Sequence, residues 1–101
     1  MHCLTKHSTD ASALLKAMSN RHRLMVLCEL WNGERSVGEL ERIVGLSQSA
    51  LSQHLARLRR DKLVRTRREA QTIYYSLAGD EAAALIRALV RLYANEDEVR
   101  A

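Results

Sequence analysis

The segment Ser47–Arg60 constrains the fold of this chain more than any other stretch of its sequence. Leu51, Leu55 and Leu58 recur at the spacing that places them on one side of a helix, facing a core. Ser47 precedes the run and suits the N-cap position. The other faces carry polar side chains, at Gln48, Ser49, Ser52, Gln53 and Arg57. Because such side chains hydrogen-bond base edges and phosphates, the pattern favours a helix that enters a DNA groove over a merely solvated surface helix.

The residues before this segment predict the first half of a helix-turn-helix. Ser36 and Glu39 have the spacing of a capping box, which would open a short helix. Its inward side chains are expected to be Leu40, Ile43 and Val44. Gly45-Leu46 then forms the turn that leads into the helix from Ser47.

Two further helices are predicted near the N-terminus. Asp10 is expected to cap the first, which runs to about Met18, and Asn20 to cap the second, from Arg21 to about Trp31. Asn32-Gly33 ends the second helix. Its core side chains are expected to be Leu24, Leu27, Cys28 and Trp31.

After Asp61-Lys62 the apolar period changes to two, which predicts strands at 63–67 and 72–77. Ile73, Tyr75 and Leu77 share one face of the second strand. The link at 68–71 has no Gly or Asn and is a weak turn signal, but the flanking strands have suitable lengths and the tip is basic. A basic hairpin directly after a DNA-reading helix is the wing of a winged helix-turn-helix.

Asp80 is expected to cap a last helix that ends near Asn95. This helix is apolar around much of its circumference, so it cannot hide all of that surface in so small a domain, and a second copy of the chain would cover it. The expected dimer interface joins the first and last helices through Leu14, Leu15, Met18, Leu85, Leu89, Leu92 and Tyr93. The expected fold is therefore mainly α with a two-stranded β wing (α+β), in the order α-α-α-α-β-β-α. Residues 1–9 would form a flexible arm, 10–95 the domain, and 96–101 a short acidic tail.

Charge and composition narrow the class of protein. Seven Lys or Arg and two acidic residues lie between Ser47 and Ser76, a net charge of +5, while the whole chain has +4. This confined basic block favours a polyanionic partner. The chain shows no signal-like start, no membrane-length apolar run and only two cysteines, so we expect a cytoplasmic protein without membrane contact. We see no catalytic constellation and expect no enzyme.

Two stretches of the sequence resemble the ArsR/SmtB family of dimeric winged-helix repressors. They are Ser47–Leu55 in the DNA-reading helix and Arg68–Tyr75 in the wing, and the resemblance spans residues 12–94. Within the family the chain is most similar to the branch of HlyU, BigR, SqrR and NolR. The resemblance implies a homodimer that represses transcription from an inverted-repeat operator in double-stranded DNA.

The same resemblance implies roles for individual residues. Gln48, Ser49, Ser52 and Gln53 would lie near base edges. Contacts to phosphates or the minor groove would come from Arg23, His54, Arg57, Arg67, Arg68 and Gln71. For His54 a role as a buried, hydrogen-bonded residue of the helix is an equal alternative.

Effector sensing is less well defined by the sequence. Metal-sensing members carry Cys-x-Cys where this chain has Ser36 and Gly38, and its last helix lacks histidine, so we expect no metal and no other cofactor. His2, Cys3 and His7 form only a loose cluster. Cys28 matches one cysteine of the thiol-sensing members, but the second position falls near Ala94, which leaves Cys3 as the candidate partner.

Three interpretations therefore stay open. The chain is derepressed by oxidants or persulfides at Cys28 with Cys3, or it is an effector-independent regulator similar to NolR, in which Cys28 is a small buried hydrophobic residue. The third hypothesis is a winged-helix module that binds protein or RNA.

Overall fold

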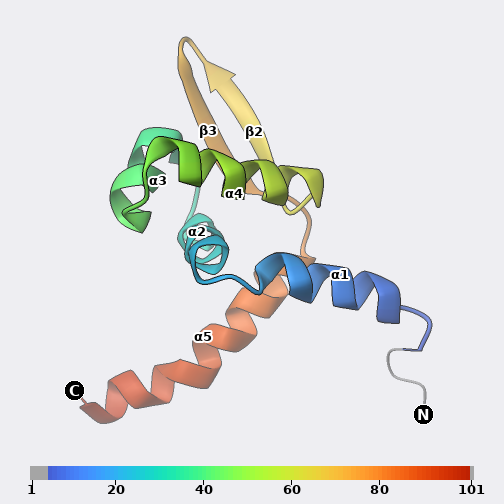
Figure 1. Cartoon of the computed structure of the whole chain (residues 1–101). Helices are drawn as coiled ribbons and strands as arrows, with labels where there is room; N and C mark the ends of the chain where they lie inside the picture. The colour runs from blue at the N-terminus through green and yellow to red at the C-terminus, as the bar shows by residue number, and fades with distance from the viewer. Residues whose placement is uncertain (1–4, 101) are drawn as a thin grey trace.

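The computed structural model describes the backbone of residues 5–100 and the side chains of residues 5–94. Its elements, seen in Figure 1, are α1 (Ser8–Met18), α2 (Arg21–Trp31), β1 (Arg35–Ser36), α3 (Val37–Val44), α4 (Gln48–Arg60), β2 (Val64–Glu69), β3 (Thr72–Leu77) and α5 (Glu81–Arg100). The predicted fold class is confirmed: helices dominate, and a β-hairpin wing follows α4. The order of elements also agrees, apart from one additional short strand, β1.

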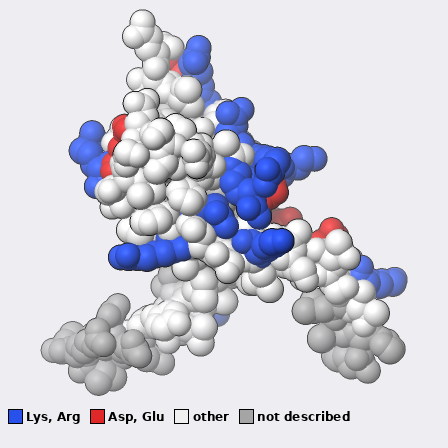
Figure 2. All heavy atoms as spheres, in the orientation of Figure 1, with Lys and Arg blue, Asp and Glu red and all other residues white. Residues whose placement is uncertain are grey.

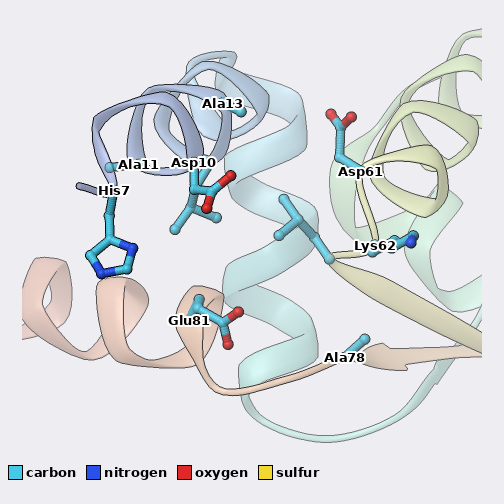
Figure 3. A pocket seen from close by; sticks show the side chains of 10 residues that line it. His7, Asp10, Ala11, Ala13, Asp61, Lys62, Ala78 and Glu81 are labelled. Atoms are coloured by element: carbon cyan, nitrogen blue, oxygen red, sulfur yellow. The ribbon is translucent and has the colours of Figure 1, made fainter.

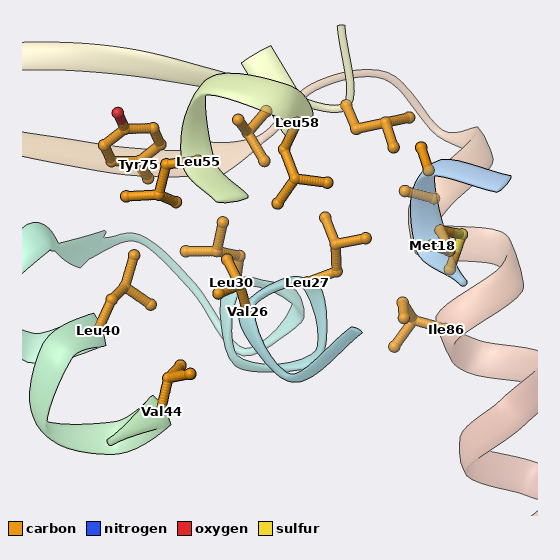
Figure 4. Packing of buried hydrophobic residues seen from close by; sticks show 14 of the residues in the cluster. Met18, Val26, Leu27, Leu30, Leu40, Val44, Leu55, Leu58, Tyr75 and Ile86 are labelled. Carbon is orange, nitrogen blue, oxygen red and sulfur yellow. The ribbon is translucent and has the colours of Figure 1, made fainter. Parts of the chain in front are cut away.

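Helix α2 lies at the centre of the core and contacts the other four helices and β3. Its Val26, Leu27 and Leu30 are buried, and they meet side chains from every neighbouring element (Figure 4). The labelled partners are Met18, Leu40, Val44, Leu55, Leu58, Tyr75 and Ile86. Each such side chain stabilises the fold by about 1.5–3 kcal/mol when it is fully buried, so one shared cluster holds the DNA-reading helix in place.

Two side chains expected in the core are substantially exposed instead. Trp31 is 37 % exposed and Ile43 is 42 % exposed. The buried face of α2 is centred on Leu27 and ends at Leu30, so Trp31 in the last turn lies beyond the elements that cover this face. In α3, Leu40 alone is fully covered, and Ile43 points away from the cluster.

Polar caps set the starts of three helices as predicted. The Asn20 side chain accepts hydrogen bonds from the backbone of the first turn of α2, at 3.0 Å from both His22 N and Arg23 N. Ser36 and Glu39 form the reciprocal capping box of α3, and the Ser47 hydroxyl accepts from Ala50 N at 3.3 Å. These bonds satisfy backbone donors that have no partner within the helix.

The prediction that Asp10 caps α1 is wrong. The helix begins at Ser8, and the residue before it, His7, makes no side-chain cap. Asp10 therefore lies inside the first turn, where its carboxylate interacts favourably with the helix dipole. The prediction therefore placed Asp10 near the start of α1 but set the first helical residue a few positions too late.

Helix α4 ends in a Schellman motif whose left-handed residue is a lysine. Leu63 N donates to Leu58 O and Lys62 N to Arg59 O, both at 3.0 Å, and Lys62 has φ 62°. This position favours glycine, because a side chain in the left-handed region costs about 1–2 kcal/mol.

Replacing Lys62 by Gly is therefore expected to stabilise the protein. Relative to Lys62→Ala, which removes the same charge but keeps a Cβ, we expect a gain of about 1 kcal/mol after the entropy cost of glycine. Urea unfolding of the two variants measures the difference. Equal midpoints would show that the left-handed backbone at residue 62 is not strained.

The wing is longer than predicted and belongs to a three-stranded antiparallel sheet with the order β1-β3-β2. Strand β2 covers 64–69, not 63–67, and Glu69 pairs with Thr72. The turn is therefore only Ala70-Gln71, with Ala70 at φ 55°. Strand β1 has just two residues, opposite Tyr74 and Tyr75, and is too short to leave a periodic pattern in the sequence.

Helix α5 begins at Glu81 as expected but continues to Arg100, past the predicted end near Asn95. In Figure 1 it leaves the body of the molecule, and α1 lies across its first turns. Ala82 and Ile86 are buried in the core, whereas Tyr93, farther along the same stripe, is exposed. In the part of the chain that is described, no helix combines the length and apolar character needed to cross a membrane.

Candidate nucleic-acid interface

Helix α4 has one buried face and one free polar face. Leu51, Leu55 and Leu58 are buried against the core, which fixes the rotation of the helix. Gly45, at φ 75°, provides the left-handed residue of the turn that leads into it. As a result four of the predicted base-contacting side chains are exposed together, at Gln48, Ser49, Ser52 and Gln53.

The start of α4 and the tip of the wing come together around a shallow hollow. Gln48 from the helix and Gln71 from the wing both line it, along with Thr72 and Ile73 of β3 and Glu41 of α3. These two glutamines are 23 positions apart in the sequence, and both are candidate DNA-contacting residues. The fold thus combines the helix and the wing into one surface.

Arginines extend this polar surface at both ends. In Figure 2 the Lys and Arg atoms gather over the region of α4 and the wing, with few acidic atoms among them. The arginines involved are Arg57, Arg59 and Arg60 in the last turn of α4 and Arg68 in β2; Arg65 and Arg67 lie in the same strand but on its other face. The sequence predicts only a net charge for Arg59, Arg60 and Arg65. Their spacing does not show which arginine side chains face outward.

Three arginines expected at phosphates are also used within the protein: Arg23, Arg57 and Arg67, the last of which pairs with Glu34 and Glu69. Arg23 is partly buried, and its Nε donates to the carbonyl of Ala17 at 2.6 Å, which caps the C-terminal end of α1. Burial lowers the pKa of Arg23, with nearby Arg57 as a further cause. Arg57 itself pairs with Asp61 at 2.9 Å, one turn along α4, but keeps part of its surface in solvent.

His54 lies on the side of α4 that faces α2. Its ring centroid is 5.7 Å from that of His22, and the side chain is half-buried. Burial lowers the pKa of His54 below its ordinary value, and the positive charge of Arg23 lowers it further. The ring thus packs between α2 and α4, which favours a structural role for His54.

We expect the stability of the protein to fall as the pH drops below 6.5. The unfolded chain binds a proton at His54 near this ordinary pKa, while the folded protein binds it only at lower pH. The His54 ring therefore makes its full contribution to the free energy of unfolding above pH 6.5. This contribution is lost as the pH falls towards the lowered pKa. Urea midpoints between pH 7.5 and 5.5 test this, and His54→Gln should flatten the profile. An unchanged slope in the variant would contradict it.

Cys28 packs on the core side of α2 and is half-buried. Burial raises the pKa of its thiol, and the adjacent carboxylate of Glu29 raises it further. Because the thiolate is the reactive form, this setting disfavours rapid oxidation. The proposed partner, Cys3, lies outside the described residues, as does His2, so their loose cluster with His7 stays untested.

A second hollow lies away from this surface, between α1, the end of α4 and the start of α5 (Figure 3). Its ionisable lining residues are His7, Asp10, Asp61, Lys62 and Glu81. Among the side chains of residues 5–94, no three His, Cys, Asp or Glu residues lie close enough to hold a metal ion. At the family's metal position, Ser36 is engaged in the capping box of α3.

Helix α3, the glycine turn, the exposed face of α4 and the basic hairpin together define a winged helix-turn-helix protein that binds DNA. The comparisons with known proteins agree with this class. Residues 20–66 match the model of the family described as "Bacterial regulatory protein, arsR family". The transcriptional activator HlyU of Vibrio cholerae is 55% identical over 95 residues, covering 94% of this chain and 88% of that protein.

Solved structures show the same likeness along the chain. Reduced HlyU from Vibrio cholerae has a TM-score of 0.86 at 56% identity, covering 92% of this chain and 98% of that one. The transcriptional repressor BigR from Xylella fastidiosa gives 0.87 at 41% identity, over 91% and 94%. The homodimeric winged helix-turn-helix domain of Mb0332 from Mycobacterium bovis gives 0.75 at 32%, over 97% and 91%. The chain therefore belongs to the arsR family of transcriptional regulators.

Proposed function

We propose that this protein is a cytoplasmic, sequence-specific repressor that binds an inverted-repeat operator as a homodimer. The exposed polar face of α4 carries the proposal, because four hydrogen-bonding side chains lie side by side on a helix that the core holds rigidly. A single helix of this kind reads only a few base pairs, so two copies related by a two-fold axis would read a palindrome with half-sites about one helical turn apart. We propose repression because the similar protein BigR is named a transcriptional repressor.

The dimer is supported by an apolar hollow between α1 and α5. Its apolar lining residues are Leu15, Met18, Leu24, Leu85, Ala88 and Leu89, and Lys16 and Ser19 complete the lining. Leu15 is 57 % exposed and Leu92 is 67 % exposed, and together with this hollow they leave an apolar face that a second copy would cover. Met18 and Leu85 are covered mainly by their own chain, so we assign the larger part of the interface to Leu15, Leu89, Leu92 and Tyr93.

In this complex Gln48, Ser49, Ser52 and Gln53 would read base edges in the major groove. Arg57, Arg59, Arg60 and Arg68 would contact phosphates, and Gln71 at the tip of the wing would reach the neighbouring minor groove. We assign Arg23 and His54 to the packing of α2 against α1 and α4, because both are partly buried there.

We further propose that operator binding does not depend on the redox state of Cys28. The half-buried thiol with its raised pKa supports a packing role. In this respect the protein would be an effector-independent regulator similar to NolR, the alternative that its sequence left open.

The test is fluorescence anisotropy with a DNA duplex selected from a random library by the protein itself. We expect saturable binding to a palindrome, a steep dependence on salt, and the same affinity before and after polysulfide treatment. A loss of affinity that reductant reverses, and that Cys28→Ser abolishes, would instead establish Cys28 as a sensor. Flat, weak affinity for every DNA sequence would favour a winged-helix module for protein or RNA.

A further inference from the structure

Arg67, in the middle of the wing, is bound within the protein through all three of its guanidinium nitrogens. Nε and Nη2 donate to the two carboxylate oxygens of Glu34, at 3.0 and 2.7 Å. Nη1 donates to Glu69 at 2.8 Å. The guanidinium carbon also lies 4.5 Å from the centre of the Tyr74 ring. Two carboxylates and an aromatic face therefore hold one arginine, and the group has a net charge of −1.

The sheet register explains how residues far apart in sequence meet here. Arg67 pairs with Tyr74, and Tyr74 pairs with Ser36, so the three strands lie side by side at this level. Glu34 directly precedes β1 and thereby reaches Arg67 across the sheet. A separation of 33 positions between the two partners leaves no local pattern in the sequence.

The neighbouring arginine projects to the other face. Side chains alternate along a strand, so Arg68 lies on the face of Ile73, with which it pairs. Ile73 lines the hollow that Gln48 and Gln71 share. Arg68 is therefore on the side of α4 and its polar face, while Arg67 is turned away towards Glu34.

We propose that Glu34 is a positioning residue that keeps Arg67 from binding DNA phosphates and thereby limits the sequence-independent affinity of the protein for DNA. Phosphate contacts raise affinity for every DNA sequence by the same factor, so a cation withheld from them lowers the affinity for bulk DNA and makes binding less dependent on salt. A single exposed ion pair is weak, but a bidentate guanidinium–carboxylate contact with a second carboxylate and a ring face is better held. The inference rests on DNA binding itself and not on the palindromic operator proposed above.

The experiment measures the affinity of random-sequence duplex DNA as a function of KCl for four proteins. They are the wild type, Arg67→Gln, Glu34→Gln and the double variant. Each phosphate contact adds about 0.9 to the slope of log affinity against log salt concentration. We expect Arg67→Gln to leave the slope unchanged, Glu34→Gln to steepen it by about 0.9 per protomer, and the double variant to return to the wild-type slope.

Other outcomes would overturn the proposal. A shallower slope for Arg67→Gln would show that Arg67 already binds phosphate in the wild type. A slope unchanged by Glu34→Gln, or steepened equally in the double variant, would show that Glu34 does not act through Arg67. Glu81→Gln, which removes one charge at the start of α5, controls for net charge, and thermal melts confirm that all variants fold. A protein that binds random DNA but selects no palindrome would refute the proposed operator and leave this test valid.

Discussion

Replacing Leu92 by Glu is expected to convert the protein from a dimer into a monomer. Leu92 is 67 % exposed in the isolated chain, so the substitution costs the monomer little. In a two-fold dimer the same position occurs twice, and the loss of two buried leucines removes about 3 kcal/mol or more. The dissociation constant of the dimer should rise by more than about a hundredfold, and operator affinity should fall with it. Light scattering and sedimentation measure the change.

Leu92→Glu is a cleaner test than a charge at Leu89, because Leu89 is half-buried within its own chain. Arg91→Glu is the matched control: it introduces the same side chain one residue away, about 100° around α5 and off the stripe of Leu85 and Leu89. We expect this variant to stay dimeric. A Leu92→Glu protein of unchanged mass would refute the proposed interface.

Replacing Gln53 by Ala is expected to weaken operator binding by about 1–3 kcal/mol, or roughly 5- to 150-fold, for each half-site. The reason is that a glutamine makes two hydrogen bonds to a base edge, which an alanine cannot replace. Gln53 is exposed on α4, so the substitution leaves the core intact. Affinity for random-sequence DNA should stay within about twofold, because base contacts contribute little there. Ser49→Ala should show a smaller effect of the same kind.

Arg60→Gln provides the contrast. Its guanidinium lies in the last turn of α4, and we expect its removal to weaken operator and random DNA alike and to make the salt dependence shallower. Equal losses on both DNAs for Gln53→Ala would show that Gln53 does not read bases. Anisotropy titrations with both duplexes, at several salt concentrations, measure all of these effects.

The helical part of the fold could be predicted from the sequence because its signals are local. Asn20, Ser36 and Ser47 are caps that act within one turn, and Leu51, Leu55 and Leu58 repeat with the period of a helix. The same local reasoning was wrong at Asp10, because α1 begins two residues earlier, at Ser8. It also failed where a helix face extends past the elements that cover it, as at Trp31.

The sequence predicted which side chains of α4 belong to the candidate DNA-binding surface. It predicted much less well which arginines belong to it. An apolar stripe defines the opposite, polar face of α4, so Gln48 and Gln53 were assigned without knowledge of the fold. No comparable sequence pattern shows whether an arginine is free or paired, so Arg23, Arg67 and Arg68 could not be distinguished from the sequence. Arg23 nevertheless caps α1 and Arg67 binds Glu34, while Arg68 projects towards the hollow beside α4.

The sequence alone determined the class of the protein. Helix periods and caps act over a few residues, and the basic block between Ser47 and Ser76 is a property of composition, so these signals do not depend on how the chain packs. Only the tertiary structure decided which charges are available to DNA. Strand β1 is two residues long and forms only because β3 lies beside it. That pairing brings Glu34 to Arg67, across 33 positions of sequence, and whether a cation is free or paired depends on contacts of this range.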